Sequence, residues 1–374
     1  MSICMVRAPF AVLALACSLT LPVAAHESDQ DRLGSGHDNG FGRQKTVFDN
    51  HVLVSDGSVP ADVTDPNLIN AWGVVFNPTG VVWVNAADAG KSLLFDGTGK
   101  PQSLVVTVPG LNGEMGHPTG IVFSGGADFV VHNTTATGPA RFMFATEDGT
   151  IAGWAPNVDV NNAITVVDNT GVGASYRGLA SSGDGSTHLL YATDFHNARI
   201  DVFDGTFKPV QVPGGFRDRF LPRGYAPFGI QAINGDIYVT YGKQNSAADE
   251  EEKGPGLGIV NVFDPQGRLI QRLVTHGALN APWGLALAPA SFGDFGGAIL
   301  VGNFGDGHIN AYGPRSGKFL GALRGADHRR LSIEGLWGLA FGNGVQQQKT
   351  NSLFYAAGPN DEASGVYGVI DVVH

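Results

Sequence analysis

Cysteine is almost absent from this sequence, which contains only two among its 374 residues. Both of them, Cys4 and Cys17, lie close to the N-terminus. The rest of the chain therefore offers no disulfide, no thiolate ligand for a metal and no cysteine nucleophile. The signatures of a phosphate-binding loop, a zinc protease and a serine-hydrolase elbow, GxxxxGK[ST], HExxH and GxSxG, are also missing.

Positive charge is scarce as well. Lys and Arg supply 23 residues against 34 Asp and Glu, so the formal net charge is −11 at pH 7. A chain of this sign is repelled by the phosphates of nucleic acids and by anionic membrane surfaces. We therefore expect no nucleic-acid partner, and no membrane partner once an N-terminal signal has been removed. We also expect a monomer.

Long amphipathic stretches with helical spacing are not found. Instead, 54 glycines and 20 prolines are spread between short apolar runs. Short apolar runs bounded by Gly, Pro and Asp are typical of β-strands joined by tight turns. The composition therefore predicts an all-β protein that is rich in turns.

A glycine step recurs about every 50 residues. The preceding residue is usually aromatic, and an apolar run follows each time: VVF, IVF, LAS, IQA, LAL or LAF. The six steps are Trp72-Gly73, Thr119-Gly120, Arg177-Gly178, Phe228-Gly229, Trp283-Gly284 and Trp337-Gly338. A repeat of this length indicates a radial or solenoidal array, because a single unit cannot bury its own apolar face.

The fifth repeat shows what one unit contains. Four short strands are predicted at 283–288, 297–303, 307–312 and 318–323. Four antiparallel strands repeated radially make a propeller blade, so six repeats predict a six-bladed β-propeller of the NHL/TolB type. Only three strands follow Trp337, and a spare strand, His51–Ser55, precedes the first repeat. We expect this N-terminal strand to complete the last blade and close the ring.

The N-terminal segment has the organisation of a secretory signal. Arg7 provides the positive charge, an apolar stretch runs from Ala8 to Val23, and Val23-Ala24-Ala25 is a small-residue cleavage site. The sequence thus divides into a signal peptide (1–25), a flexible lead-in (26–50) and the propeller (51–374). An exported protein, periplasmic or extracellular, is expected. Lipidation at Cys17 is the alternative.

Functional groups are expected on one rim of the propeller, around the central channel. The loops that lead into the inner strands and the loops that follow the second strands open on this same face. Ligand-binding candidates chosen by their position in the repeat are His117, Arg177, Asn85, Asn133, Asp194, Asn303 and Asn360. Arg177 and His117 suit an anionic or carbonyl group.

Calcium is a second candidate ligand for this rim. It prefers carboxylate and amide oxygens, so Asp194, Asn133 and Asn303 are its candidate ligands. The structural alternative is that these Asn and Asp side chains cap turns, a role in which both residue types are common. The repeat tryptophans likewise pack between blades or act as stacking platforms.

An acidic insertion, residues 245–256, is the longest loop on the same rim. It carries the run Asp249-Glu-Glu-Glu252. It is either a solvated loop tip or a lid over the channel.

The chain resembles a family of exported bacterial proteins of unknown function that are predicted six-bladed propellers. The motifs that carry the resemblance are Leu53-Val-Ser-Asp56, Thr64-Asp-Pro-Asn-Leu-Ile-Asn-Ala-Trp-Gly73, Ala226-Pro-Phe-Gly229, Asn261-Val-Phe-Asp264, Asn280-Ala-Pro-Trp-Gly284, Gly302-Asn-Phe-Gly-Asp306 and Gly335-Leu-Trp-Gly338. The resemblance covers roughly residues 50–373 and implies a fold without a chemistry.

At a greater distance the chain is similar to NHL-repeat propellers and to calcium-dependent lactonase and phosphotriesterase propellers. That likeness implies calcium held by Glu, Asn and Asp near the starts of the inner strands. The corresponding positions here carry no carboxylate and no Asn, so no catalytic residue is transferred. Two hypotheses remain. The protein binds a small molecule or protein segment in its top-face crater, or it is a calcium-dependent hydrolase with a rearranged metal site.

The signal segment gives the first testable prediction. Cleavage after Ala25 produces a mature chain that begins at His26 and contains no cysteine. Intact-mass measurement of the exported protein should find this species. A chain that begins at a lipidated Cys17 would contradict it.

Overall fold

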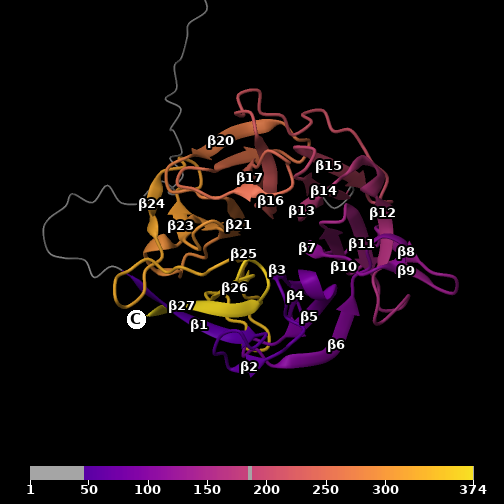
Figure 1. Cartoon of the computed structure of the whole chain (residues 1–374), viewed down its shortest axis with the longest axis horizontal. Helices are drawn as coiled ribbons and strands as arrows, with labels where there is room; N and C mark the ends of the chain where they lie inside the picture. The colour runs from indigo at the N-terminus through magenta and orange to yellow at the C-terminus, as the bar shows by residue number, and fades with distance from the viewer. Residues whose placement is uncertain (1–45, 184–187, 374) are drawn as a thin grey trace, which may run out of the picture. The chain divides into compact units, whose positions relative to one another are not determined.

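The computed structural model describes residues 46–183 and 188–373, which form a ring of six antiparallel sheets (Figure 1). The predicted signal peptide and most of the predicted lead-in lie outside the described residues. Among the described residues, no helix has the length and apolar character needed to cross a membrane. The predicted all-β, six-bladed propeller is confirmed.

The first three blades follow the chain from the inside of the ring outward. Blade 1 contains β3 (Ala71–Phe76), β4 (Val82–Ala86), β5 (Lys91–Phe95) and β6 (Pro101–Thr107). Blade 2 contains β7 (Pro118–Phe123), β10 (Phe142–Thr146), β11 (Thr150–Trp154) and β12 (Ile164–Asp168). A small hairpin, β8 (Val130–His132) and β9 (Thr137–Pro139), is inserted into blade 2. Blade 3 contains β13 (Tyr176–Gly183), β14 (His188–Asp194) and β15 (Arg199–Asp204).

The remaining blades repeat the pattern. Blade 4 contains β16 (Tyr225–Ile233), β17 (Asp236–Gln244), β19 (Ile259–Phe263) and β20 (Leu269–Thr275), and the short β18 (Glu251–Glu252) pairs with β17. Blade 5 contains β21 (Pro282–Leu287), β22 (Ile299–Asn303), β23 (Ile309–Tyr312) and β24 (Phe319–Ala322). Blade 6 contains β25 (Leu336–Phe341), β26 (Leu353–Ala357) and β27 (Val366–Val373).

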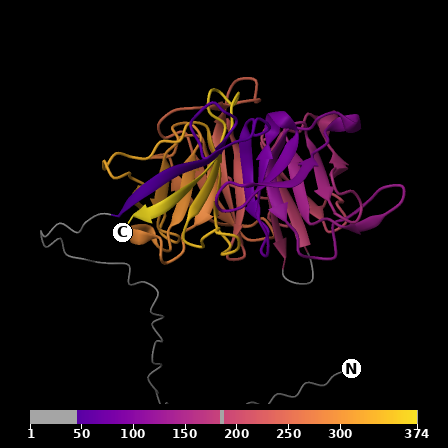
Figure 2. The ribbon, with the colours of Figure 1, turned by 90° about the horizontal axis from the view of Figure 1, so that it is seen from below.

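The N-terminal strand closes the ring, as predicted. Strand β1 (Val47–Ser55) pairs antiparallel with β27 from Val47–Val373 to Ser55–Val366, and β2 (Val63–Thr64) extends its edge. The two ends of the propeller therefore lie side by side in blade 6, which Figure 2 shows from another direction. The strand begins at Val47, inside the segment predicted to be a flexible lead-in. The hydrogen bond from Phe48 N–H to Arg324 O (2.8 Å) helps to hold this early start.

The core is divided among the blade interfaces. Each pair of neighbouring blades shares one cluster of buried apolar side chains, and a seventh cluster lies where the inner strands begin. A blade alone would leave both faces of its sheet in water, so burial between blades supplies most of the stabilisation.

The repeat glycines explain how the blades meet at the axis. A Cβ atom added to Gly229 would lie 2.0 Å from the carbonyl oxygen of Trp283 in the next blade. At Gly284 the added Cβ would lie 2.6 Å from Trp337 O, and at Gly338 it would lie 2.6 Å from Trp72 O, which returns to blade 1. Corresponding contacts at Gly73, Gly120 and Gly178 complete the circle. Each inner strand therefore approaches the next one too closely for any side chain at this position.

This close approach predicts a large effect of one methyl group. We expect Gly229→Ala to lower the free energy of unfolding by at least about 2 kcal/mol, because the colliding atoms are backbone and cannot rotate away. Gly171→Ala is the matched control, since a Cβ there meets nothing within 4 Å. Denaturant unfolding of both variants should separate them, and equal stabilities would show that the blades can move apart at no cost.

Candidate functional site

The residue before each repeat glycine lies near the axis on the face where the inner strands begin, which we call the top face. Four of these residues are aromatic, and we name the axial cluster as Trp72, Arg177, Phe228, Trp283 and Trp337. Trp72 stacks on Trp337 with ring centroids 3.7 Å apart, and Trp283 meets both rings edge-on. The tryptophans thus come together from three blades and fill the channel at its top end.

Arg177 is the charged member of this cluster and is only 4% exposed. Its guanidinium carbon lies 5.6 Å from the Trp72 ring centroid and 5.7 Å from that of Phe195. One terminal nitrogen, Nη1, lies 2.7 Å from Glu147 Oε1, and the other, Nη2, donates to Asp249 O at 2.6 Å. A guanidinium can be buried in this way because carboxylate, carbonyl and ring faces replace its water.

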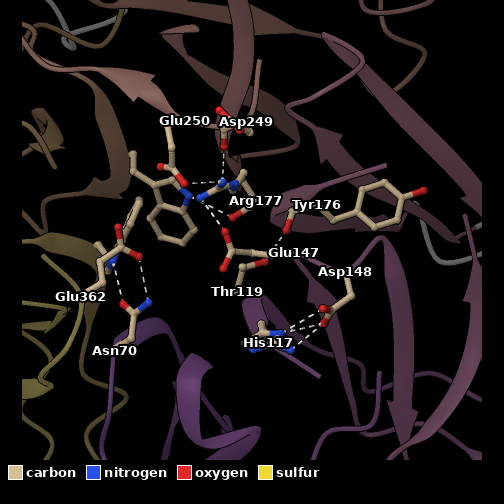
Figure 3. A network of polar contacts seen from close by, with 12 residues as sticks. Asn70, His117, Thr119, Glu147, Asp148, Tyr176, Arg177, Asp249, Glu250 and Glu362 are labelled. Carbon is tan, nitrogen blue, oxygen red and sulfur yellow. Dashed lines mark hydrogen bonds and ion pairs between the residues drawn. The ribbon is translucent and has the colours of Figure 1, made fainter. Parts of the chain in front are cut away.

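A pocket of about 350 Å³ opens beside Arg177 on the top face, and we call it the top pocket. Blades 2, 3 and 4 supply its walls. The lining residues are His117, Glu147, Asp148, Gly173, Ser175, Arg177, His196, Asp249 and Glu250. Figure 3 shows Glu147 and Glu250 around Arg177, and the His117–Asp148 pair to one side of them.

A tight turn in blade 2 holds two of the acids. Glu147 and Asp148 lie between β10 and β11, and Gly149 completes the turn with a positive φ of 80°. The hydroxyls of Thr146 and Thr150, 2.8 Å apart, close the turn beneath them. The backbone N–H of Glu147 also donates to His117 O at 3.0 Å, so this turn and the loop before β7 form one unit.

His117 and Asp148 form an oriented pair. The backbone N–H of His117 donates to Asp148 Oδ2 at 2.8 Å, and the ring Nδ1 lies 2.9 Å from Asp148 Oδ1. This hydrogen bond, together with the nearby carboxylates, raises the pKa of His117 above its ordinary value although partial burial opposes the shift. Since Nδ1 is engaged, the geometry directs proton exchange with a ligand to Nε2.

The acidic loop is folded onto the pocket. Asp249 O accepts from Arg177, Glu250 Oε1 lies 3.7 Å from Arg177 Nη2, and Ala248 O lies 3.0 Å from His196 Nδ1. Asn245 caps the loop from within, because its side chain accepts from the Ala247 N–H and donates to Asp249 Oδ1. The loop therefore forms one wall of the top pocket.

Carboxylates outnumber cations around Arg177. Burial raises the pKa of Glu147, an effect that the neighbouring Arg177 opposes. Burial also raises the pKa of Glu251 and that of Glu362 to about 7 each. Glu362 Oε2 accepts from Asn70 Nδ2 at 2.9 Å, whereas Glu251 Oε2 is buried without a partner among the described residues. One guanidinium does not balance this many acids when all are ionised, so the site favours the protonated forms of the buried ones in the absence of another cation.

The structure brings together two of the predicted site residues, His117 and Arg177, in the top pocket. Asn85 lies elsewhere: it is fully buried, and its Nδ2 donates to Thr119 O of the next blade at 2.9 Å. The hydroxyl of Thr193 forms an equivalent tie to Phe228 O at 2.7 Å. Asn85 is thus one of the polar side chains that link neighbouring inner strands.

Asn133 is not on the top rim, which corrects its predicted place. It lies in the turn of the β8–β9 hairpin at the outer edge of blade 2 (Figure 1), where its Oδ1 accepts from the N–H groups of Thr135 and Ala136. The strand before Asn133 belongs to this separate hairpin, and the second strand of blade 2 is β10. Asn360 caps its own loop through Ser364 Oγ at 3.0 Å.

The residues proposed for calcium do not form a cation site. Asp194 is fully buried, and its two oxygens accept from the N–H groups of Ser175 and Asn197 and from the Asn197 side chain. Asn303, on another blade, donates through its Nδ2 to Ala278 O and to Asp306. Within residues 46–183 and 188–373, no three His, Asp or Glu side chains gather as a metal-binding group. The donor set present does not fit calcium.

Sequence reasoning missed Glu147, Asp148 and Glu362. The signal for the first two was available, since Thr146-Glu-Asp-Gly149 is a turn motif that follows an apolar strand. The inserted hairpin contains two additional short strands before β10. Counting strands in the sequence therefore does not assign this turn to the end of the second strand of blade 2. Glu362 is the last of three successive residues with positive φ, after Asn360 and Asp361, and the sequence alone does not show this geometry.

The fold and the site define a six-bladed propeller with a polar pocket on its top face. Solved structures of the same architecture include the PQQ-bound aldose sugar dehydrogenase of Streptomyces coelicolor, with a TM-score of 0.52 and 13% identity over 88% of this chain and 99% of that one. Virginiamycin B lyase from Staphylococcus aureus has a TM-score of 0.46 and 12% identity, over 88% of this chain and all of that one. At these identities the likeness concerns the fold alone.

Curated relatives place the chain in a family. It is 30% identical over 342 residues to uncharacterized protein R648 of Acanthamoeba polyphaga mimivirus, which covers 89% of this chain and 82% of the relative. Uncharacterized protein L690 of the same virus is 29% identical over 342 residues, 88% of each chain. The chain belongs to this family. These relatives are viral, whereas the resemblance had implied a bacterial family. No protein-family model matches the chain.

The raised pKa of Glu251 gives a prediction about stability. Because its folded pKa of about 7 exceeds the ordinary 4.5, the proton stabilises the folded state. This stabilisation is complete below about pH 4.5 and is lost as the pH rises through about 7. We expect Glu251→Gln, which removes the charge, to gain on the order of 2 kcal/mol relative to the wild type between pH 5 and pH 8.

Urea unfolding at several pH values measures this difference. Glu114→Gln, at an exposed position in another loop, is the control and should follow the wild type. A constant difference between Glu251→Gln and the wild type over this range would show that Glu251 does not titrate there.

Proposed function

We propose that this protein binds a small organic cation, an amine or a guanidinium compound, in its top pocket. The observation that carries the proposal is the surplus of carboxylates beside a cavity of about 350 Å³. That volume falls within the range of small-molecule sites. Four acidic residues line the pocket against one permanent cation, Arg177.

The pocket offers several distinct acceptors for an ammonium group. Glu250 is more than half exposed and lies 3.7 Å from Arg177 Nη2, so its carboxylate is available to a ligand. The pKa of Glu147 is raised, which means that its ionised form is under-stabilised in the free protein. A bound cation would stabilise that form, and this differential interaction favours binding.

The hydrolase alternative receives less support. Its metal ligands do not converge, as described above. The His117–Asp148 pair gives the pocket an oriented imidazole with a raised pKa, so proton transfer to or from a bound ligand is compatible with the proposal. No second functional group among the described residues defines a reaction.

The proposal predicts selectivity by charge. Isothermal titration calorimetry should show agmatine and n-butylamine binding at pH 8, while the matched neutral and anionic probes, butanol and butyrate, should not displace agmatine. Glu250→Gln should weaken agmatine binding at least about fivefold, since it removes one partly exposed carboxylate from the wall.

Asp361→Asn is the matched control. It removes one negative charge from an exposed loop of the same face that does not line the pocket. Its agmatine affinity should equal that of the wild type. Equal losses of agmatine affinity in both variants would show that the affinity reflects only the long-range negative potential of this face. Binding of butyrate in preference to agmatine would overturn the proposal.

A further inference from the structure

The apolar runs that follow the six repeat glycines line a second cavity, which we call the lower well. Its volume is about 510 Å³, and every blade contributes residues of its inner strand to the wall. These runs lie C-terminal to the axial cluster on the same strands. The lower well therefore occupies the channel beyond the aromatic filling, away from the top pocket.

The axial cluster closes one end of this well. Trp72 and Trp337 are fully buried and stacked across the axis, directly before the lining residues of β3 and β25. The other end communicates with solvent, because Gln231 and Asn234 are lining residues with exposed side chains. Three successive residues per strand give a depth of about 10 Å. The shape is that of a blind well suited to an elongated molecule.

Four blades contribute only apolar side chains to the well, while each inner strand pairs on one edge only and its free backbone edge adds polar groups. The contributions of these four blades are Val74–Phe76, Ile121–Phe123, Leu285–Leu287 and Leu339–Phe341. Several of these side chains, including Phe76, Val122 and Phe341, are only half-buried even though they lie around the axis. The well thus keeps apolar surface in contact with water, and an apolar ligand would remove that surface from water.

The polar side chains of the well are confined to one side. Ser181 comes from blade 3, and Gln231 and Asn234 come from the neighbouring blade 4. Among the described residues, no side chain that lines the well carries a charge. A ligand with an ionised group would therefore lose hydration without gaining a partner, whereas a hydroxyl or carbonyl could bond to an amide or hydroxyl of this side.

From this lining we infer that the lower well is a second binding site, which takes an elongated, uncharged apolar molecule bearing one hydroxyl or carbonyl group. The size is sufficient, since a dry cavity of about 150 Å³ already encloses a benzene molecule. The site is independent of the proposed cation site, because the axial cluster separates the two cavities. The alternative occupant is water, which would be held by the polar side chains and by the free backbone edges of the inner strands.

Straight-chain alcohols test the inference on the whole protein. Ligand-observed NMR or calorimetry should show saturable binding of 1-hexanol, 1-octanol and 1-decanol, with the affinity rising about fourfold per added methylene as apolar surface is buried. Decanoate should bind at least about tenfold more weakly than 1-decanol, because its carboxylate finds no cation in the well.

Variants locate the binding. Ala340 is a half-buried lining residue, so Ala340→Leu should fill part of the well and weaken 1-decanol binding at least about tenfold. Gln231→Leu, at an exposed position, should reduce the preference for 1-decanol over decane. Ala290→Leu is an exposed control outside the lining and should bind like the wild type. Melting temperatures report whether each variant is folded.

Two results would overturn the inference. One is the absence of saturable alcohol binding to the wild type, which would leave the well to water. The other is alcohol affinity that folded Ala340→Leu and Gln231→Leu leave unchanged, which would place the alcohol elsewhere. Glu250→Gln should not affect alcohol binding, so failure here is distinguishable from failure of the cation proposal.

Discussion

The ring depends on one steric constraint, the contact between the backbone of each inner strand and that of the next. A Cβ at Gly229 would lie 2.0 Å from a carbonyl oxygen of the neighbouring blade, and the other five glycines meet their neighbours in the same way. Only glycine allows this separation. Because six such contacts form a closed circle, a displacement of one inner strand requires the inner strands of the other blades to move as well.

The same constraint determines what lies on either side of it along the axis. On the top face, the residues before the glycines converge, and three tryptophans pack together there with Phe228. Arg177 occupies the corresponding position in blade 3, so its guanidinium lies among aromatic side chains. There it attracts carboxylates from three other blades. The acidic top pocket is thus a consequence of placing one arginine in a position otherwise used for packing.

Much of the fold could be predicted from the sequence, and less of the site. The glycine period was sufficient to predict six blades, because the step recurs along the sequence. The spare strand before Trp72 was sufficient to predict closure, because the strands of each repeat can be counted in the sequence. His117 and Arg177 were found because they are the ionisable residues beside a repeat step. Asn85 and Asp194 look the same in sequence as ligand-binding residues, yet they satisfy buried backbone groups of a neighbouring strand or loop. That distinction depends on contacts between blades. Whether such a side chain is structural is therefore decided by packing between residues that are far apart in the sequence. A pattern within one repeat holds no information about that packing.

The two ends of the axis differ in chemistry for a related reason. The loops of the top face are free to vary in length, and insertion 245–256 uses that freedom to bring acids to Arg177. The lower well is built from strand residues whose neighbours are fixed by β pairing, so its wall is restricted to what a packed sheet tolerates. Charged side chains can therefore accumulate at the top, where loops and solvent accommodate them, while the described side chains that line the lower well are uncharged. The axial cluster therefore lies between a top pocket lined by charged side chains and a lower well whose described lining side chains are uncharged.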